Sequence, residues 1–136
     1  MTLQQCQLVD DFIRESGIEH WRVLKILTVD NAQAEAALAW ARVLDPSASR
    51  SYLFIGCKSN FLSQLTRSLA AEFGELAVRF NAIAIDGVSN HWGLHGIAAF
   101  LLSNDASYVT GVTVFPQDQV EMQSIGSPTS PRANMT

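Results

Sequence analysis

The sequence lacks several features that would assign the protein to a broad functional class. The chain has 136 residues, and none of its apolar runs reaches the roughly 18 uncharged residues that a membrane-spanning helix needs. The first stretch, MTLQQCQLVDDFIRES, carries acidic residues early and has no basic region followed by an apolar block, unlike a secretory signal. We therefore expect a cytoplasmic protein that makes no contact with a membrane.

Basic residues and cysteines are also scarce. Nine Lys and Arg residues stand against thirteen Asp and Glu, which gives a net charge of −4 at pH 7. Because the basic residues are scattered and form no patch, we expect no binding to nucleic acid. Cys6 and Cys57 have neither the spacing of a metal site nor a disulfide framework around them, so reduced, buried thiols are the simpler interpretation.

The apolar content predicts one domain with a substantial core, since 48% of the residues are hydrophobic and 16% are charged. Helical periodicity covers residues 3–16, 31–44, 60–73 and 92–103. Apolar runs typical of buried strands cover residues 21–29, 52–56, 76–85 and 108–115. This alternation predicts an α/β domain over residues 1–116, with about four parallel strands and flanking helices. Residues 117–136 are polar and dotted with proline, so we expect a disordered tail.

The order of these elements restricts how the helices cover the sheet. If successive strands are neighbours joined by right-handed crossovers, most of the helices lie on one face. The other face then needs cover from the fourth helix, from the tail or from another subunit.

Two segments resemble the short-chain dehydrogenase/reductase family. Residues 63–87, SQLTRSLAAEFGELAVRFNAIAIDG, are similar to the family's long helix and following strand, where a stretch like LTRSLAAE precedes an RVNAIAPG-like strand. Residues 97–111, IAAFLLSNDASYVTG, are similar to the family's late helix and last strand, often written AxFLxSxxASYxTG. The likeness spans about residues 8–115 and implies a three-layer, Rossmann-like remnant that corresponds to the second half of the family fold.

The residues that carry the family's chemistry have no counterpart in this sequence. No G-x-x-x-G-x-G turn is present to hold a dinucleotide pyrophosphate. The family also uses a tyrosine acid/base and a lysine four residues later. The aligned positions here are Ile55 and Ser59, or Phe54 and Lys58 after a slip of one residue. The substrate loop that normally follows the next strand is reduced to a short connection after Asp86, so we expect no bound cofactor.

A few residues are weak candidates for a rewritten site. Cys57 stands where the family has a serine, and Lys58 and a helix start beside it could activate a thiolate, although an inert cysteine is the simpler interpretation. His91 and His95 could share one helix face as metal ligands, but no third ligand is near in the sequence, which favours capping and packing roles. Asn31 matches an asparagine of the family's fourth-helix region, and a plain helix N-cap explains it equally well.

The resemblance also implies a subunit interface. In the family, the helices that correspond to residues 31–44 and 59–73 pack against their symmetry mates in a four-helix dimer contact. This sequence keeps small residues and an apolar edge on those helices, and the predicted interface residues are Ala34, Ala37, Ala41, Leu62, Thr66 and Ala70. We therefore expect a homo-oligomer through these two helices, or a hetero-oligomer with an intact reductase.

The leading hypothesis is a non-catalytic, shortened short-chain dehydrogenase/reductase-like protein that acts as an oligomeric binding, scaffold or regulatory subunit. One alternative is a small biosynthetic lyase, isomerase or hydrolase with rewritten chemistry. Another is a fragment completed by a partner that carries the NAD(P)-binding half. Whether the chain is an enzyme is left open, with no catalysis as the favoured interpretation, and conventional NAD(P)-dependent oxidoreductase activity is not expected.

Overall fold

A parallel sheet of four strands forms the centre of the fold. The computed structural model describes residues 1–27, 31–43 and 51–116, apart from the side chains at positions 31, 32, 34, 38, 41 and 42. The strands lie in the order β1-β2-β3-β4, and each pairs in parallel with the next. Their bounds are β1 Val23–Lys25, β2 Ser51–Gly56, β3 Arg79–Ala84 and β4 Thr113–Val114. The predicted α/β, Rossmann-like arrangement is confirmed; the predicted disordered tail, residues 117–136, lies outside the described residues.

Four α-helices flank the sheet, and local signals set their ends. They are α1 (Leu3–Ser16), α2 (Asn31–Val43), α3 (Asn60–Phe73) and α4 (Trp92–Leu102). Thr2 and Gln5 form a capping box at the start of α1, and Gly17 ends that helix in the left-handed conformation, with φ 76°. Ser59 caps α3 by accepting a hydrogen bond from the Leu62 amide at 3.0 Å. Among the described residues, no helix is long and apolar enough to cross a membrane.

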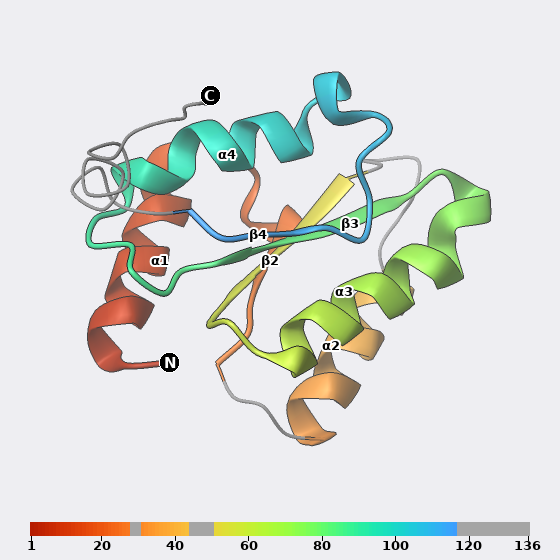
Figure 1. Ribbon diagram of the computed structural model, residues 1–136, viewed down its shortest axis with the longest axis horizontal. Coiled ribbons are helices and arrows are strands. Elements are labelled where there is room, and N and C mark those ends of the chain that lie inside the picture. The colour runs from red at the N-terminus through yellow and green to blue at the C-terminus, as the bar shows by residue number, and fades with distance from the viewer. Residues whose placement is uncertain (28–30, 44–50, 117–136) are drawn as a thin grey trace, which may run out of the picture.

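The helices form two layers with the sheet between them (Figure 1). α2 and α3 cover one face, where the rings of Tyr52, Phe54 and Phe80 stack on neighbouring strands. α1 and α4 cover the other face, where Phe12 and Leu94 are fully buried against the side chains of β2 and β3. The fold therefore has two hydrophobic cores, and the fourth helix is one of the elements that cover the second face, as one of the predicted alternatives allowed.

The three crossovers do not share one hand. Successive strands are neighbours and all are parallel, so a crossover on one face has the opposite hand from a crossover on the other. The crossovers through α2 and α3 pack on one face, whereas the crossover through α4 packs on the opposite face. The condition under which most helices would lie on one face, that every crossover is right-handed, is therefore not met, and two helices lie on each face.

Two strands are much shorter than predicted because other structure replaces their ends. Residues His20–Arg22 form the 3₁₀ helix η1 ahead of β1. Before β4, Gly111 adopts a left-handed conformation with φ 77°, which interrupts the strand. There the Gly111 amide donates to the Phe80 carbonyl, and the buried side chain of Asn81 adds bonds to the backbone of Val109 and Val112.

Two arginines hold the C-terminal end of α4 at the amino edge of the sheet. Arg79 donates to the backbone carbonyls of Leu101 at 3.1 Å and Ser103 at 2.9 Å, and also to that of Ala106 in the 3₁₀ helix η3 (Asn104–Ala106). Arg22 donates to the Leu102 carbonyl at 2.9 Å. The last carbonyls of a helix lack partners within the helix and carry partial negative charge, so these cations both satisfy and stabilise them.

Candidate functional site

The junction between β2 and α3 lies at the carboxyl edge of the sheet, where open α/β sheets bind ligands. β2 ends at Gly56 and α3 begins at Asn60, so Cys57, Lys58 and Ser59 form the whole connection. Gly56 is tightly enclosed, since a Cβ atom there would lie 3.1 Å from Ile26 Cβ and 3.3 Å from the Ile26 carbonyl oxygen. The connection is therefore short and closely packed against the end of β1.

Cys57 is partly buried against the first turn of α1. Its thiol donates to Gln5 Oε1 at 3.5 Å, and the same oxygen accepts from the Thr2 amide at 2.8 Å. Burial, followed by the negative charge of Asp86, raises the pKa of the Cys57 thiol. A raised pKa keeps the thiol protonated at neutral pH, which is the opposite of what an activated thiolate requires.

Lys58 is held at both its backbone and its side chain. Its amide donates to Asp86 Oδ1 across the edge, at the end of β3. Its ammonium group lies 5.6 Å from the centroid of the Phe115 ring, which follows β4. Lys58 thus joins the ends of three neighbouring strands, and the contacts in which it takes part are structural.

Neither tyrosine of the sequence lies at this edge. Tyr52 is fully buried near the amino end of β2, between the rings of Trp40 and Phe80. Tyr108 precedes β4 and is 99% exposed. The other lysine of the chain, Lys25, pairs with Asp10, with 2.8 Å between Nζ and Oδ1. The tyrosine and lysine pair that the family resemblance would place near Cys57 is thus absent from the described carboxyl edge.

A groove runs between α1 and the connection from β3 to α4. It consists of two adjoining hollows of about 460 and 250 Å³ that share Gln4, Leu8 and Ser89 as lining residues. The larger hollow is also lined by Thr2, Gln5 and Gly87, and the smaller one continues along α1 to Asp11. Amides and hydroxyls make up much of this lining and the Asp11 carboxylate lies in the smaller hollow, so the groove offers mainly neutral hydrogen-bonding groups at the edge of the sheet where ligands bind.

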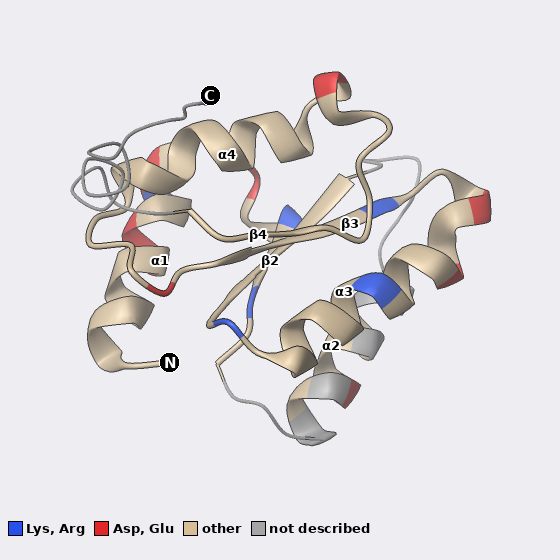
Figure 2. Cartoon of the chain, in the orientation of Figure 1, with Lys and Arg blue, Asp and Glu red and all other residues tan. Residues whose placement is uncertain are grey.

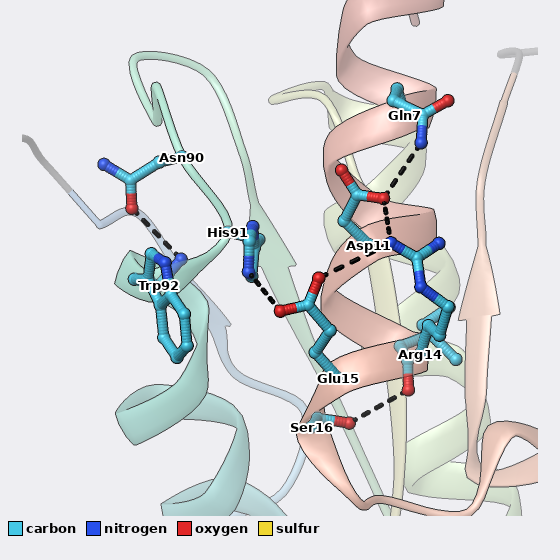
Figure 3. Close-up of polar contacts among 9 residues, drawn as sticks. Gln7, Asp11, Arg14, Glu15, Ser16, Asn90, His91 and Trp92 are labelled. Carbon is cyan, nitrogen blue, oxygen red and sulfur yellow. Dashed lines mark hydrogen bonds and ion pairs between the residues drawn. The ribbon is translucent and has the colours of Figure 1, made fainter.

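His91 and His95 pack between α1 and α4 instead of opening into a metal site. His91 Nε2 lies 3.2 Å from Glu15 Oε1, in a polar network that continues through Arg14 to Asp11 and Gln7 (Figure 3). The His95 ring stacks on Trp92 and meets the edge of Phe12. Among the described residues, no group of three or more His, Cys, Asp or Glu side chains could hold a metal ion.

Asn90, and not the expected His91, caps the start of α4 with its side chain. Asn90 Oδ1 accepts a hydrogen bond from the Trp92 amide at 3.0 Å, whereas His91 makes no capping bond with its side chain. Asn31 is the first residue of α2, and its side chain lies outside the described part of the structure.

Four of the six predicted interface residues are buried within the chain itself. Ala37, Leu62 and Thr66 are almost completely inaccessible, and Ala70 is 8% exposed. The Thr66 hydroxyl donates to the Leu62 carbonyl one turn earlier, at 2.7 Å. The side chains of Ala34 and Ala41 lie outside the described part. An interface through α2 and α3 would therefore have to use side chains other than these four.

Gln5, Asp86 and Ser89 contribute to the site but were not singled out from the sequence. The pattern Thr2-x-x-Gln5 is that of a capping box, which could have placed the Gln5 amide at the helix start. The motif Asp86-Gly87 indicated a turn, yet nothing in the local sequence links Asp86 to Lys58 or Gln5 to Cys57. These contacts join residues 28 and 52 positions apart, and only the fold brings them together.

No protein-family model and no curated protein sequence matches this chain. The likeness to short-chain dehydrogenase/reductases therefore stays a prediction from the sequence, and the site is interpreted from its own geometry.

Proposed function

We propose that this chain is a non-catalytic, short-chain dehydrogenase/reductase-like protein that acts in the cytoplasm as an oligomeric binding or regulatory subunit. The observation that carries the proposal is the junction between β2 and α3. Each residue of this connection contributes to a packing, capping or strand-bridging contact, and the Cys57 thiol has a raised pKa.

Reduction of a carbonyl requires a proton donor beside the position of the nicotinamide. Tyr52 is enclosed in an aromatic core and Tyr108 precedes β4, so neither supports this role. Cys57 does not support a thiolate mechanism either, because its charged form is disfavoured by burial and by Asp86. These placements favour binding over catalysis.

The groove along α1 is the surface that we propose for ligand binding. Its larger hollow, of about 460 Å³, lies within the size range of small-molecule sites. Gln4, Gln5 and Ser89 supply amide and hydroxyl groups, and no lysine or arginine lines either hollow. The lining of the larger hollow, which holds no charged side chain, suits a neutral polar molecule better than a dinucleotide, whose pyrophosphate is bound at glycine-rich helix starts; the Asp11 carboxylate of the smaller hollow also disfavours a pyrophosphate.

Titration with NADH and NADPH, followed by nucleotide and tryptophan fluorescence, tests the proposal. We expect no saturable change for either nucleotide with the wild-type chain. A Gln4→Ala variant is the matched control. It alters one side chain that lines the groove and leaves the capping box of Thr2 and Gln5 intact, so a fluorescence change that it abolishes comes from the groove. Saturable micromolar binding of a nucleotide, accompanied by turnover of a carbonyl substrate, would overturn the proposal.

A further inference from the structure

A hollow of about 330 Å³ lies at the amino edge of the sheet, opposite the edge that carries the groove along α1. Its walls come from the connection between α3 and β3 and from the connection between α4 and β4. A hollow of this size can hold a small molecule, and the chemistry of its walls determines which kind.

Among the residues that line this hollow, only Arg79 is charged, and its hydrogen bonds leave part of the guanidinium group unused. Nη1 donates to the carbonyls of Leu101 and Ala106, and Nη2 donates to that of Ser103. A guanidinium group has more N–H donors than these contacts use. The N–H of Nε and one N–H of Nη2 therefore remain without a partner among the described residues, which also give Arg79 no carboxylate partner.

The other polar residues of the lining add neutral hydrogen-bonding groups. Neither the carboxamide of Asn104 nor the hydroxyl of Ser107 bonds to another described residue. The Thr110 hydroxyl oxygen accepts from the Phe80 amide at 3.2 Å, which leaves its own hydrogen free to donate. Neutral donors and a guanidinium group without a carboxylate partner thus line the same hollow, and such a combination favours an anion.

The backbone of one wall has an unfavourable conformation. Ala77 lines the hollow with φ 59° and ψ 32°, and it is the one non-glycine residue with positive φ in the part of the chain that the structure describes. A side chain is disfavoured in this left-handed region. Residues held in such conformations are enriched at ligand sites, so the strain at Ala77 supports a binding role for the hollow.

The surrounding charges determine which anion fits. Burial, followed by the charge of Arg22, lowers the pKa of Arg79, so an anion at Arg79 would offset the repulsion between the two guanidinium groups. Glu75 and Asp105 are exposed and stand next to lining residues in the sequence, although neither lines the hollow. Figure 2 shows blue at the start of β3, and red at the C-terminal end of α3 and in η3. These acidic residues disfavour a polyanion and favour a ligand with a single negative charge.

We propose that this amino-edge hollow binds a small molecule that carries one carboxylate group. The carboxylate oxygens accept from Nε and Nη2 of Arg79, and the hydroxyls of Ser107 and Thr110 contact the rest of the ligand. A planar guanidinium group with two adjacent donors matches the geometry of a carboxylate. The hollow differs from the groove along α1 in place and in chemistry, so the inference goes beyond the proposed function and does not depend on it.

Titration of the full chain with benzoate, followed by heteronuclear NMR, tests the inference. We expect saturable shifts of the Arg79 Nε–H signal and of the backbone amides of residues 104–110. Benzamide is the matched control ligand, because it has nearly the same shape without the charge, and it should bind at least about tenfold more weakly. Inorganic phosphate should also bind more weakly than benzoate, because Glu75 and Asp105 repel its higher charge.

A variant with a new charge tests the place of binding and keeps the contacts of Arg79 with α4. Ser107 is exposed, and Ser107→Asp puts a carboxylate in the hollow that competes with the ligand, so benzoate should bind at least about tenfold more weakly. Ser68→Asp is the matched control, since Ser68 is exposed on α3 outside the hollow, and it should leave the affinity for benzoate unchanged.

Four results would overturn the inference: no saturable shift at Arg79, equal affinity for benzoate and benzamide, tighter binding of phosphate than of benzoate, or equal effects of the variants at Ser107 and Ser68. None of these results depends on whether a nucleotide binds or on the oligomeric state of the chain.

Discussion

The buried side chain of Asn81 bonds to the backbone of Val112 across the last strand pair of the sheet. Asn81 Oδ1 accepts from the Val112 amide at 3.0 Å, and Asn81 Nδ2 donates to the Val109 carbonyl at 3.0 Å. This carboxamide holds the segment before β4, together with the backbone bonds from the Gly111 amide to the Phe80 carbonyl and from the Ala82 amide to the Val112 carbonyl. One polar side chain inside the fold thus helps to position the last strand.

Replacing Asn81 should loosen this segment. Asn81→Leu leaves the Val109 carbonyl and the Val112 amide without their partner, and we expect the free energy of unfolding to fall by about 3 kcal/mol. Asn81→Asp keeps the acceptor but loses the donor, and an uncompensated buried charge makes it at least as damaging. Urea denaturation followed by circular dichroism measures both, and an Asn81→Leu variant as stable as the wild type would contradict this role.

Arg79 should be more important for stability than an ordinary surface arginine. Its guanidinium group satisfies carbonyls at the end of α4 and in η3, and burial, followed by the charge of Arg22, lowers its pKa. We expect Arg79→Met to reduce the free energy of unfolding by about 3 kcal/mol, because hydrogen bonds to charged groups are lost and carbonyls are left unpaired.

Arg67→Met is the matched control for Arg79→Met, since Arg67 lies exposed on α3. It should change the free energy of unfolding by less than about 0.5 kcal/mol. Chemical denaturation of both variants checks the difference, and equal effects at the two positions would contradict the assignment. Arg79→Lys should recover only part of the loss, because one ammonium group cannot reproduce the planar fork of the guanidinium.

The reactivity of Cys57 should depend on pH in a defined direction. Its pKa is raised in the folded state, so the thiol form stabilises the fold below the ordinary thiol pKa of about 8.5, and this contribution is lost as the pH rises through the raised value. In a Cys6→Ser background, Cys57 should react with iodoacetamide more slowly than a free model thiol near that pH, and unfolding in urea should remove the difference.

Asp86→Asn tests whether the charge of Asp86 contributes to the raised pKa of Cys57. The variant removes the negative charge that contributes to the raised pKa of Cys57 while keeping an oxygen that can accept from the Lys58 amide. Alkylation of Cys57 should become faster than in the parent protein at the same pH. A Cys57 thiol that already reacts faster than a model thiol in the parent protein would contradict the inert-thiol interpretation.

The tight junction predicts that Gly56 tolerates no side chain. An added Cβ would press on Ile26, so Gly56→Ala should lower the free energy of unfolding by about 1 to 3 kcal/mol through overpacking. At Gly74 nothing lies within 4 Å of an added Cβ, and Gly74→Ala should be close to neutral in the same thermal or chemical denaturation experiment. Similar losses at both positions would show that the enclosure of Gly56 is not what matters.

The helices could be predicted from the sequence because their end signals are local. Gly17 and Ser59 act within a few residues of their own positions, and the predicted bounds of α1 and α3 agree with the structure. The length of β4 was predicted wrongly because the left-handed conformation of Gly111 interrupts the apolar run. The bonds that Asn81 makes to this segment, about 30 residues away in the chain, could not be predicted from the local sequence. The face covered by α4 stayed open among the predicted alternatives, because the general rule for right-handed crossovers favours the other face.

The candidate site could be predicted in part. The short connection from β2 to α3 is visible in the sequence, and the structure places Cys57 and Lys58 at the carboxyl edge. The partners that determine their chemistry, Gln5 and Asp86, come from distant segments, and their capping-box and turn motifs do not indicate that they contact Cys57 and Lys58. Exposure of side chains on α2 and α3 was equally hidden, since the helical pattern does not tell a core side from an interface side.

Hydride transfer is the most direct test of the central claim that the β2–α3 junction supports no reductase chemistry. The oxidation of NADPH and NADH should be followed by absorbance with the wild-type chain and a panel of aldehydes and ketones, with a heat-denatured sample as control. We predict that the rate with each carbonyl equals that of the denatured sample. A saturable rate that is proportional to protein concentration and survives repurification would contradict the account.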